Sequence, residues 1–290
     1  MTMNVREISS EEFGNCIEME NDGTELLVTL DHGPRIVSVI KNGVQFIYNK
    51  TDPAVGRSFG HKMRITLEKS TNGIYCDNSP VRYSPMGNGV RFVQTVTEPV
   101  QMEAIIDVSF TDEGELAVEH SIYNKSREGL KLSIYTETPF CSDGFVFIPQ
   151  GRAASPERPG KIMTLWEDCK WSDERLFIGD EFVTVKATDL QDRPRLKIGL
   201  NDTIGLVGFI GRKFSLLKQY THNSSALYPF YNCSAFATEN NGYLSIQMTS
   251  PFYLVEPEEA ARHIEKWSIL PESRDISPDD EENIRIVIGE

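Results

Sequence analysis

The chain is built from short runs in which apolar and polar residues alternate, and glycine-containing turns separate many of these runs. Side chains of a β-strand point alternately to the two faces of a sheet, so this alternation is typical of strands with one buried face. Asn-Gly and Asp-Gly pairs favour tight hairpins because glycine adopts a positive φ without a Cβ clash. The sequence predicts strands at 26–30, 36–40, 91–96, 105–110, 116–122, 130–135, 182–185, 204–209, 214–217 and 243–248.

Helical periodicity is weak throughout the sequence. Residues 258–266 come closest to it, and their position after Pro257 fits a strand equally well. No Gly-, Ser- or Pro-rich linker and no fixed-period repeat divides the 290 residues. We therefore predict an all-β fold in one domain spanning residues 1–290, a large two-sheet antiparallel β-sandwich. Residues 150–161 are expected to form a long loop that shapes or covers a binding face.

Charge and cysteine content narrow the range of partners. The formal net charge is −14, so the chain repels phosphate backbones and acidic membrane surfaces. The acidic run at 279–282 is expected to be a solvated loop. Five widely spaced cysteines predict reduced thiols, and neither a signal peptide nor a long apolar segment is found. We predict a cytoplasmic protein without nucleic-acid or membrane partners.

Two histidines stand among polar side chains that suit a polyhydroxylated ligand. His61 is followed by Lys62 and Arg64, whose donors suit hydroxyl oxygens or a carboxylate. Strand alternation would place His120 on the same face as the apolar Val118. His120 is therefore either a hydrogen-bonded interior histidine or a proton carrier in a cleft.

Other polar pairs also have two interpretations. Asp77 and Asn78 are typical of an Asx turn, and their side-chain oxygens would also suit sugar hydroxyls. Asp173 and Arg175 form either a surface ion pair or an acceptor and a fork-shaped donor next to Trp171. Chelating histidine spacings, HExxH, dinucleotide-binding and Gly-x-Ser-x-Gly motifs are all missing from the sequence, which predicts no metal and no cofactor. The sequence therefore predicts a site that works by acid–base chemistry and hydrogen bonding.

Taken together, these segments resemble the galactose mutarotase-like superfamily, which includes the aldose 1-epimerases, over nearly the whole chain. The resemblance implies the supersandwich form of the β-sandwich and a cleft that binds sugar. It is carried by residues 33–36, 43–48, 60–62, 75–81, 119–124, 148–150, 166, 173–176, 228–229, 250–251 and 263–267.

The resemblance also implies roles for individual residues. In the epimerases one histidine protonates the ring oxygen of the sugar, and a second histidine binds the sugar. These roles would fall to His120 and His61, while Asp173 with Arg175 would hold hydroxyl groups. One group must take the proton of the anomeric hydroxyl while another donates to the ring oxygen, so the two must face each other across the sugar.

The general base of these epimerases is a glutamate on a late strand, and here the matching stretch contains Gln247 instead. An amide does not accept a proton at useful pH, and losing a general base costs on the order of 100- to 10,000-fold in rate. Either another carboxylate, such as Glu68 or Asp77, has taken the role, or the cleft binds sugar without turnover.

Three functions therefore stay open: an aldose 1-epimerase-type isomerase, a non-catalytic sugar-binding or regulatory module, and a polysaccharide lyase or hydrolase on the same fold. A small sugar or sugar acid is the expected partner, and convergence of the basic side chains would favour an acidic sugar. With His61 and His120 as catalytic candidates, the predicted substrate-binding residues are Arg35, Lys62, Arg64, Glu68, Asp77, Asn78, Asp173, Arg175 and Gln247.

Overall fold

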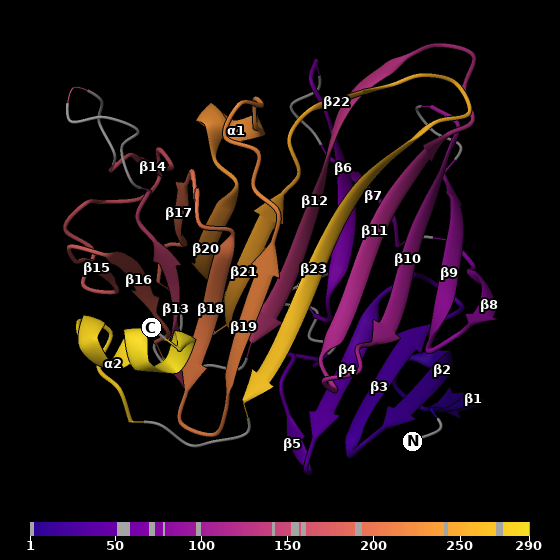
Figure 1. Cartoon of the computed structure of the whole chain (residues 1–290), viewed down its shortest axis with the longest axis horizontal. Helices are drawn as coiled ribbons and strands as arrows, with labels where there is room; N and C mark the ends of the chain where they lie inside the picture. Colours follow the sequence, from indigo (N-terminus) through magenta and orange to yellow (C-terminus); the bar gives the residue numbers. More distant parts are fainter. Residues whose placement is uncertain are drawn as a thin grey trace.

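The chain folds into three antiparallel sheets with two short helices (Figure 1). Strands account for 57% and helices for 5% of the computed structural model, which confirms the all-β prediction. The structure describes residues 3–50, 59–69, 73–77, 79–96, 100–140, 143–151, 157, 161–188, 193–240, 243–270 and 275–289.

The largest sheet has ten strands and runs along the whole molecule (Figure 1). Near its centre, a strand that contains Leu116 pairs with a strand that contains Trp267. Strands from the middle and from the end of the chain therefore lie side by side. In spatial order the strands are β15 (Leu176–Ile178), β16 (Phe182–Lys186), β13 (Gly144–Pro149), β18 (Leu206–Gly211), β19 (Ser215–Tyr220), β23 (Ala260–Leu270), β11 (Leu116–Asn124), β10 (Met102–Phe110), β9 (Gly89–Val96) and β8 (Arg82–Met86).

The second sheet has eight strands and forms the other layer of the sandwich. Its longest strand, β12, pairs with β21 and β6, and β22 pairs with the beginning of β12. The strands are β14 (Met163–Leu165), β17 (Leu196–Leu200), β20 (Ala235–Asn240), β21 (Tyr243–Thr249), β12 (Leu130–Phe140), β6 (Lys62–Leu67), β7 (Ile74–Tyr75) and β22 (Tyr253–Val255).

A third sheet of five strands comes from the N-terminal part of the chain (Figure 1). Its apolar side chains, among them Ile17 and Leu26, belong to the same core as those of the two larger sheets. The strands are β1 (Asn4–Ser10), β2 (Gly14–Asn21), β3 (Thr24–Thr29), β4 (Ile36–Lys41) and β5 (Val44–Gln45).

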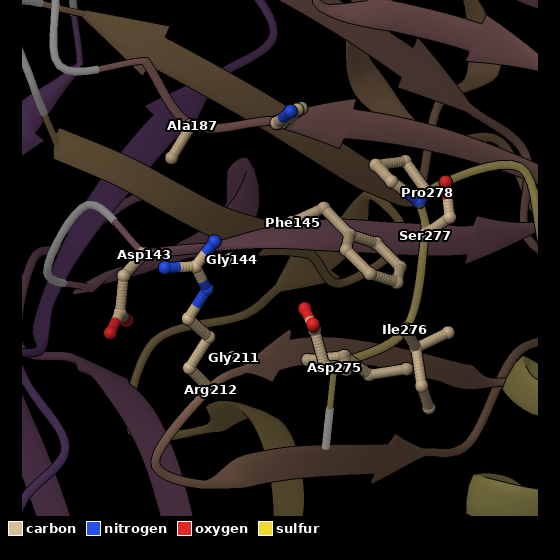
Figure 2. Close-up of a pocket in the computed structure, with 12 residues that line it drawn as sticks. Asp143, Gly144, Phe145, Ala187, Gly211, Arg212, Asp275, Ile276, Ser277 and Pro278 are labelled. Atoms are coloured by element: carbon tan, nitrogen blue, oxygen red, sulfur yellow. The ribbon is translucent and has the colours of Figure 1, made fainter. Parts of the chain in front are cut away.

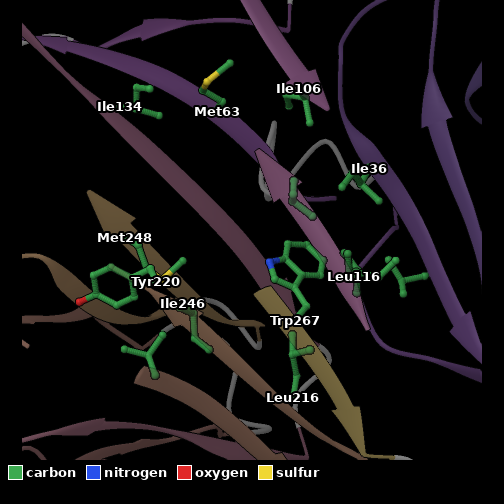
Figure 3. Close-up of a cluster of buried hydrophobic side chains, with 14 of the residues drawn as sticks. Ile36, Met63, Ile106, Leu116, Ile134, Leu216, Tyr220, Ile246, Met248 and Trp267 are labelled. Carbon is green, nitrogen blue, oxygen red and sulfur yellow. The ribbon is translucent and has the colours of Figure 1, made fainter. Parts of the chain in front are cut away.

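The main hydrophobic core fills the space between the layers (Figure 3). Met63, Ile134 and Ile246 enter it from the eight-stranded sheet, and Leu116 and Trp267 enter it from the ten-stranded sheet. All five side chains are almost completely buried, as expected where two sheets stack with their apolar faces together. This arrangement confirms the predicted sandwich, and every predicted strand falls within or overlaps an observed strand.

The acidic run at 279–282 corrects the expectation of a solvated loop. It opens helix α2 (Glu281–Ile288), where the side chain of Asp280 accepts a hydrogen bond from the backbone N–H of Asn283. Acidic groups at a helix N-terminus are favoured by the unpaired N–H groups and the helix dipole. Ile284 and Val287 then pack on the outer face of the ten-stranded sheet. The short element α1 (Pro229–Asn232) is a single turn in which Phe230 and Tyr231 have positive φ.

Residues 258–266 and residues 150–161 are the other two segments with a predicted structure. Residues 258–266, which suited helix or strand, largely form β23. Most of the expected loop at 150–161 lies outside the described residues, because 152–156 and 158–160 are not among them.

Candidate functional site

Strand alternation divides the side chains of β12 between the two faces of the eight-stranded sheet. Ile134 enters the core, so its neighbours Tyr135 and Glu137 point to the outer face. The register pairs Tyr135 with Arg64 and Glu137 with Lys62, and paired residues of neighbouring strands lie on the same face. Two cations and one carboxylate thus meet on the outer face of the sheet.

Strand pairing on the other side of β12 adds further residues to the outer face. Glu137 pairs with Gln247 on β21, and Gln247 pairs in turn with Phe236 on β20. Thr238, two residues further along β20, pairs with Lys197 on β17. We call Lys62, Arg64, Tyr135, Glu137, Lys197, Phe236 and Gln247 the outer-face site.

Glu137 is held as a carboxylate at the centre of the outer-face site. Its Oε2 lies 3.3 Å from Nζ of Lys62, and its Oε1 lies 3.4 Å from Nε2 of Gln247. Burial acts to raise the pKa of Glu137, but Lys62, Lys197 and Arg64 outweigh it and leave the pKa below its usual value. Burial also lowers the pKa of Lys62, although Glu137 opposes this effect.

Lys197 lies among aromatic rings. Its Nζ is 4.7 Å from the ring centroid of Trp166, 5.2 Å from that of Phe236 and 5.5 Å from that of Tyr135. It donates a hydrogen bond of 3.1 Å to the hydroxyl of Tyr135. Burial, followed by the positive charge of Arg64, lowers the pKa of Lys197 to about 7. This amine therefore exchanges its proton near neutral pH.

Arg64 offers an unused donor next to these groups. Its guanidinium carbon lies 3.8 Å from the ring centroid of Tyr135, an arrangement typical of a cation–π contact. Its Nε is buried, and no described residue accepts a hydrogen bond from it. A buried donor without an acceptor is costly, and a bound ligand oxygen would remove that cost.

An aromatic wall borders the charged groups. Trp166 and Phe230 pack against the cluster of Tyr135, Cys233 and Phe236. The ring centroids of Phe230 and Phe236 are 5.8 Å apart, and those of Trp166 and Phe236 are 5.9 Å apart. Small-ligand sites commonly combine such apolar surfaces with a few polar groups.

The structure brings Lys62, Arg64 and Gln247, three of the predicted binding residues, together on this face. Arg35 and Asp77 form a buried ion pair, and the charge of Arg35 contributes to the lowered pKa of Lys62. Arg35 also donates to the backbone oxygen of Phe59 at 2.9 Å. The predicted Asn78 lies outside the described residues.

Three other predicted binding residues have internal or surface partners. Glu68 forms an ion pair with Lys131 in which both side chains are 41% exposed. Arg175 is buried between Asp173, at 2.6 Å, and Glu239. Glu239 pairs with the core residue Leu244, so its side chain points away from the outer face. Arg175 and Asp173, which are bound to each other and to Glu239, therefore lie outside the outer-face site.

His61 and His120 meet, but they do so inside the sandwich. Their Nε2 atoms are 2.8 Å apart, and neither side chain has any exposed surface. His61 immediately precedes β6, so alternation turns it inward while Lys62 points outward. The predicted contact of both imidazoles with a sugar therefore has no support in their position.

The two imidazoles belong to a hydrogen-bonded chain that crosses the core. Lys218 donates to the hydroxyl of Thr138 at 2.6 Å, and that hydroxyl lies 2.8 Å from Nδ1 of His61. At the other end, Nδ1 of His120 lies 3.2 Å from the backbone oxygen of His263. One consistent assignment has Thr138 donating to His61, His61 to His120, and His120 to the carbonyl, with both rings neutral. We call these residues the interior polar chain.

Neutral rings agree with the electrostatics of the interior polar chain. Burial lowers the pKa of His120 to about 4 and places the pKa of His61 well below its ordinary value. His61, His120 and Glu265 have ligand atoms within 4.8 Å of one another, so their types and spacing could suit a cation. However, Lys218 already supplies positive charge there, with Nζ 2.7 Å from Oε2 of Glu265.

The sequence interpretation missed Glu137 and Lys197. Glu137 continues the alternation of the strand predicted at 130–135, and extending that strand would have placed Glu137 on the same face as Tyr135. Lys197 alternates with Leu196 and Ile198, a pattern typical of an outward side chain. Neither pattern reveals that the two side chains converge.

Two cavities of the described structure lie away from the outer-face site. One of about 560 Å³ lies on the outer side of the ten-stranded sheet and is lined by Phe145, Arg212 and Asp275 (Figure 2). Another of about 580 Å³ is lined by Trp171, Ile162 and other residues. Neither contains a residue of the outer-face site.

Comparison with known proteins identifies the fold. No family model matches the sequence, and no curated protein is detectably similar to it. Solved structures do match. A galactose mutarotase-like protein from Lactobacillus casei is 12% identical with a TM-score of 0.58, over 88% of this chain and 99% of that one.

Two further structures support the same conclusion. A galactose mutarotase-like protein from Clostridium acetobutylicum is 13% identical with a TM-score of 0.57, over 93% of this chain and 98% of that one. A homologue of GalM and aldose epimerase from Caenorhabditis elegans is 10% identical with a TM-score of 0.52, over 94% and 100%. The chain therefore has the galactose mutarotase-like sandwich fold, which confirms the fold implied by the resemblance drawn from the sequence. Neither described helix has the length and apolar character needed to span a bilayer.

Proposed function

We propose that the outer-face site binds a small reducing sugar or sugar acid and exchanges its anomers by acid–base chemistry. The observation that carries this proposal is the pairing of Glu137 with Gln247. Gln247 stands where the resemblance leads one to expect the basic glutamate, and the neighbouring strand supplies a carboxylate next to it. The proposed proton acceptor is therefore Glu137 on β12, one strand away from Gln247 on β21.

The proposed reaction needs one proton acceptor and one proton donor. Glu137, held ionised by the surrounding cations, takes the proton of the anomeric hydroxyl. Lys197, with a pKa of about 7, gives a proton to the ring oxygen, and the ring opens to the free aldehyde. Rotation about the opened bond and closure by the reverse proton transfers yield the other anomer.

Charge favours an acidic sugar as the ligand. Lys62, Arg64 and Lys197 present three basic groups to one carboxylate, that of Glu137. The unused Nε–H of Arg64 suits a carboxylate oxygen, and charge-assisted hydrogen bonds are stronger than neutral ones. The formal net charge of the whole chain is −14, so the outer-face site has an excess of basic groups in a chain that is acidic as a whole.

A calorimetric or NMR titration with D-glucose, D-galactose, D-glucuronate and D-galacturonate tests the binding. We expect the uronates to bind more tightly and to lose affinity as salt is raised. Arg64→Met should weaken uronate binding by roughly 10-fold or more, since a charged hydrogen bond contributes about 1.5–3 kcal/mol. If none of the four sugars binds, the proposal is rejected.

A second candidate is a sugar-binding module without turnover. The lowered pKa of Glu137 favours it, because a weakly basic carboxylate is a weaker proton acceptor. Exchange NMR of a bound sugar separates the two candidates, since only an isomerase accelerates the exchange of anomers. A lyase or hydrolase on this fold would instead cleave an oligosaccharide, which mass spectrometry detects.

The proposed location is the cytoplasm. Cys16, Cys76, Cys169 and Cys233 are free thiols, as is usual for proteins of reducing compartments. Cell fractionation with an antibody against the protein tests this location.

A further inference from the structure

The ε-amine of Lys197 has the surroundings of a reactive amine. It lies among the rings of Trp166, Phe236 and Tyr135, and the side chain is only 8% exposed. Within the part of the chain that the structure describes, its Nζ donates a hydrogen bond of 3.1 Å to the neutral hydroxyl of Tyr135. No carboxylate of the described residues forms an ion pair with it within 4.0 Å. Amines desolvated in an apolar pocket or placed beside another cation are activated as nucleophiles.

The charged and titratable groups around Lys197 act in opposite directions. Arg64 and Arg195 disfavour the ammonium form, whereas Glu137 and Cys233 favour it, and burial disfavours it more than any of these groups. The two forms of the amine are therefore both well populated near neutral pH. An ordinary exposed lysine has a pKa of about 10.4 and is almost entirely protonated there.

We infer that Lys197 forms a covalent imine with the open-chain aldehyde of a reducing sugar held at the outer-face site. This inference rests on the proposed function, because ring opening supplies the aldehyde. When Lys197 gives its proton to the ring oxygen, it becomes a neutral amine beside the newly formed carbonyl. The group that opens the ring is thus left ready to capture the product.

The condensation needs no reagent beyond the amine and the aldehyde. The nitrogen lone pair forms the C–N bond while the carbonyl π pair moves to oxygen. The two hydrogens of the amine are transferred to that oxygen, which leaves as water, and a C=N bond remains. Addition of water reverses each step and releases the sugar.

Reductive trapping tests this inference on the full-length protein. The protein is incubated with D-galactose, D-glucose, D-galacturonate or D-glucuronate and sodium cyanoborohydride, then analysed by intact mass and peptide mapping. A trapped imine adds the mass of one sugar less one oxygen atom. At about pH 7.5 the pKa of Lys197 gives it on the order of several hundred times more free amine than an exposed lysine. We expect labelling at Lys197 to exceed that at other lysines by at least about 10-fold.

Three controls define the outcome. Lys197→Met should abolish the fast adduct, whereas Lys125→Met should leave it unchanged; Lys125 also lies 4.2 Å from an aromatic ring, that of Tyr123, but is exposed. The methyl glycosides of the same sugars have no free aldehyde and should give no adduct. Peptide mapping of the wild-type protein gives the answer even if a variant fails to fold.

The outcomes separate this inference from the proposed function. A sugar that binds in the titration but labels Lys197 no faster than exposed lysines overturns the imine and leaves the binding proposal intact. If no sugar binds and none labels Lys197, both fail. Labelling that is selective for Lys197 and absent with methyl glycosides supports both.

Discussion

Glu137 and Gln247 face each other across neighbouring strands, with the amide nitrogen of Gln247 3.4 Å from a carboxylate oxygen of Glu137. A cross-strand pair places two side chains at nearly the same point of a sheet face. A carboxylate expected on one strand can therefore be supplied by the next strand without moving far in space. This relationship makes Glu137 the residue to test first.

The first prediction is that Glu137→Gln loses anomer exchange and keeps sugar binding. The amide retains hydrogen bonding but cannot accept the proton, so the rate should fall on the order of 100- to 10,000-fold. Exchange NMR of a reducing sugar measures the rate, and calorimetry measures the affinity. Glu68→Gln, which changes a carboxylate in an exposed ion pair, should leave both unchanged. A fully active Glu137→Gln protein would rule out this residue as the base.

The second prediction concerns the pH dependence of exchange. Glu137, with its lowered pKa, is ionised at all pH values near neutrality, so the donor Lys197 should control the profile. The pKa of Lys197 is about 7, so the rate should fall as the pH rises through about 7 and the ammonium form is lost. Lys197→Arg stays protonated at every pH tested and should remove that fall. A wild-type rate that is flat from pH 6 to pH 9 contradicts the assigned donor.

The third prediction is that the interior histidines make folding sensitive to acid. The pKa of His120 is about 4 in the folded protein and about 6.5 in the unfolded chain, which therefore binds more protons between these values. The stability contributed by His120 is complete above about pH 6.5 and decreases as the pH falls, by about 3 kcal/mol at pH 4. Urea unfolding at several pH values measures this loss.

The acid sensitivity of the histidine must be separated from that of Asp202. Burial raises the pKa of Asp202 to about 6, so its contribution has the opposite sign: it is present in acid and lost as the pH rises. The informative quantity is therefore the difference between the wild-type protein and His120→Asn. That difference in the free energy of unfolding should shrink from pH 7 to pH 5. A difference that is constant over this range would show that His120 is not held neutral.

The fourth prediction concerns the buried pair of Lys218 and Glu265. Lys218→Met leaves the carboxylate of Glu265 buried without its cation and should destabilise the protein by about 3–5 kcal/mol. Adding Glu265→Gln should recover part of that loss, because the uncompensated charge is removed. Lys131→Met, in an exposed pair, should cost no more than about 1 kcal/mol. Equal losses in these two lysine variants, measured by urea unfolding, would be inconsistent with the buried pair.

The sequence predicted the fold well because each strand carries its own alternation and turn signals. Alternation even placed His120 on an apolar face, and the structure buries it. The contact of His120 with a sugar came from the resemblance, and a resemblance in order and spacing does not determine which face of a strand a residue occupies. For His61 and Lys62, one residue separates the interior from the outer face.

The candidate site was predicted less completely because it depends on sheet order. Lys62, Arg64 and Gln247 were recognised individually, but their proximity to Lys197 requires β6, β12, β21, β20 and β17 to be neighbours. Apart from β20 and β21, which pair as a hairpin, these strands are widely separated along the chain, and nothing local specifies their pairing. The pKa of Lys197 likewise follows from the rings and cations around it, which come from other strands.

The interior polar chain also bears on how the two layers are aligned. Within it, His61, which immediately precedes β6, contacts His120 of β11, and Lys218 of β19 donates to Thr138 of β12. Next to it, Thr136 of β12 donates to Glu265 of β23. Each of these three contacts joins the eight-stranded layer to the ten-stranded layer. Apolar contacts alone tolerate small sideways displacements, whereas directional bonds among buried groups fail once the donor and acceptor separate. Sliding one layer over the other would break all three contacts together. These contacts therefore select a single sideways position of one sheet relative to the other. The spacing of the outward side chains is fixed with that position.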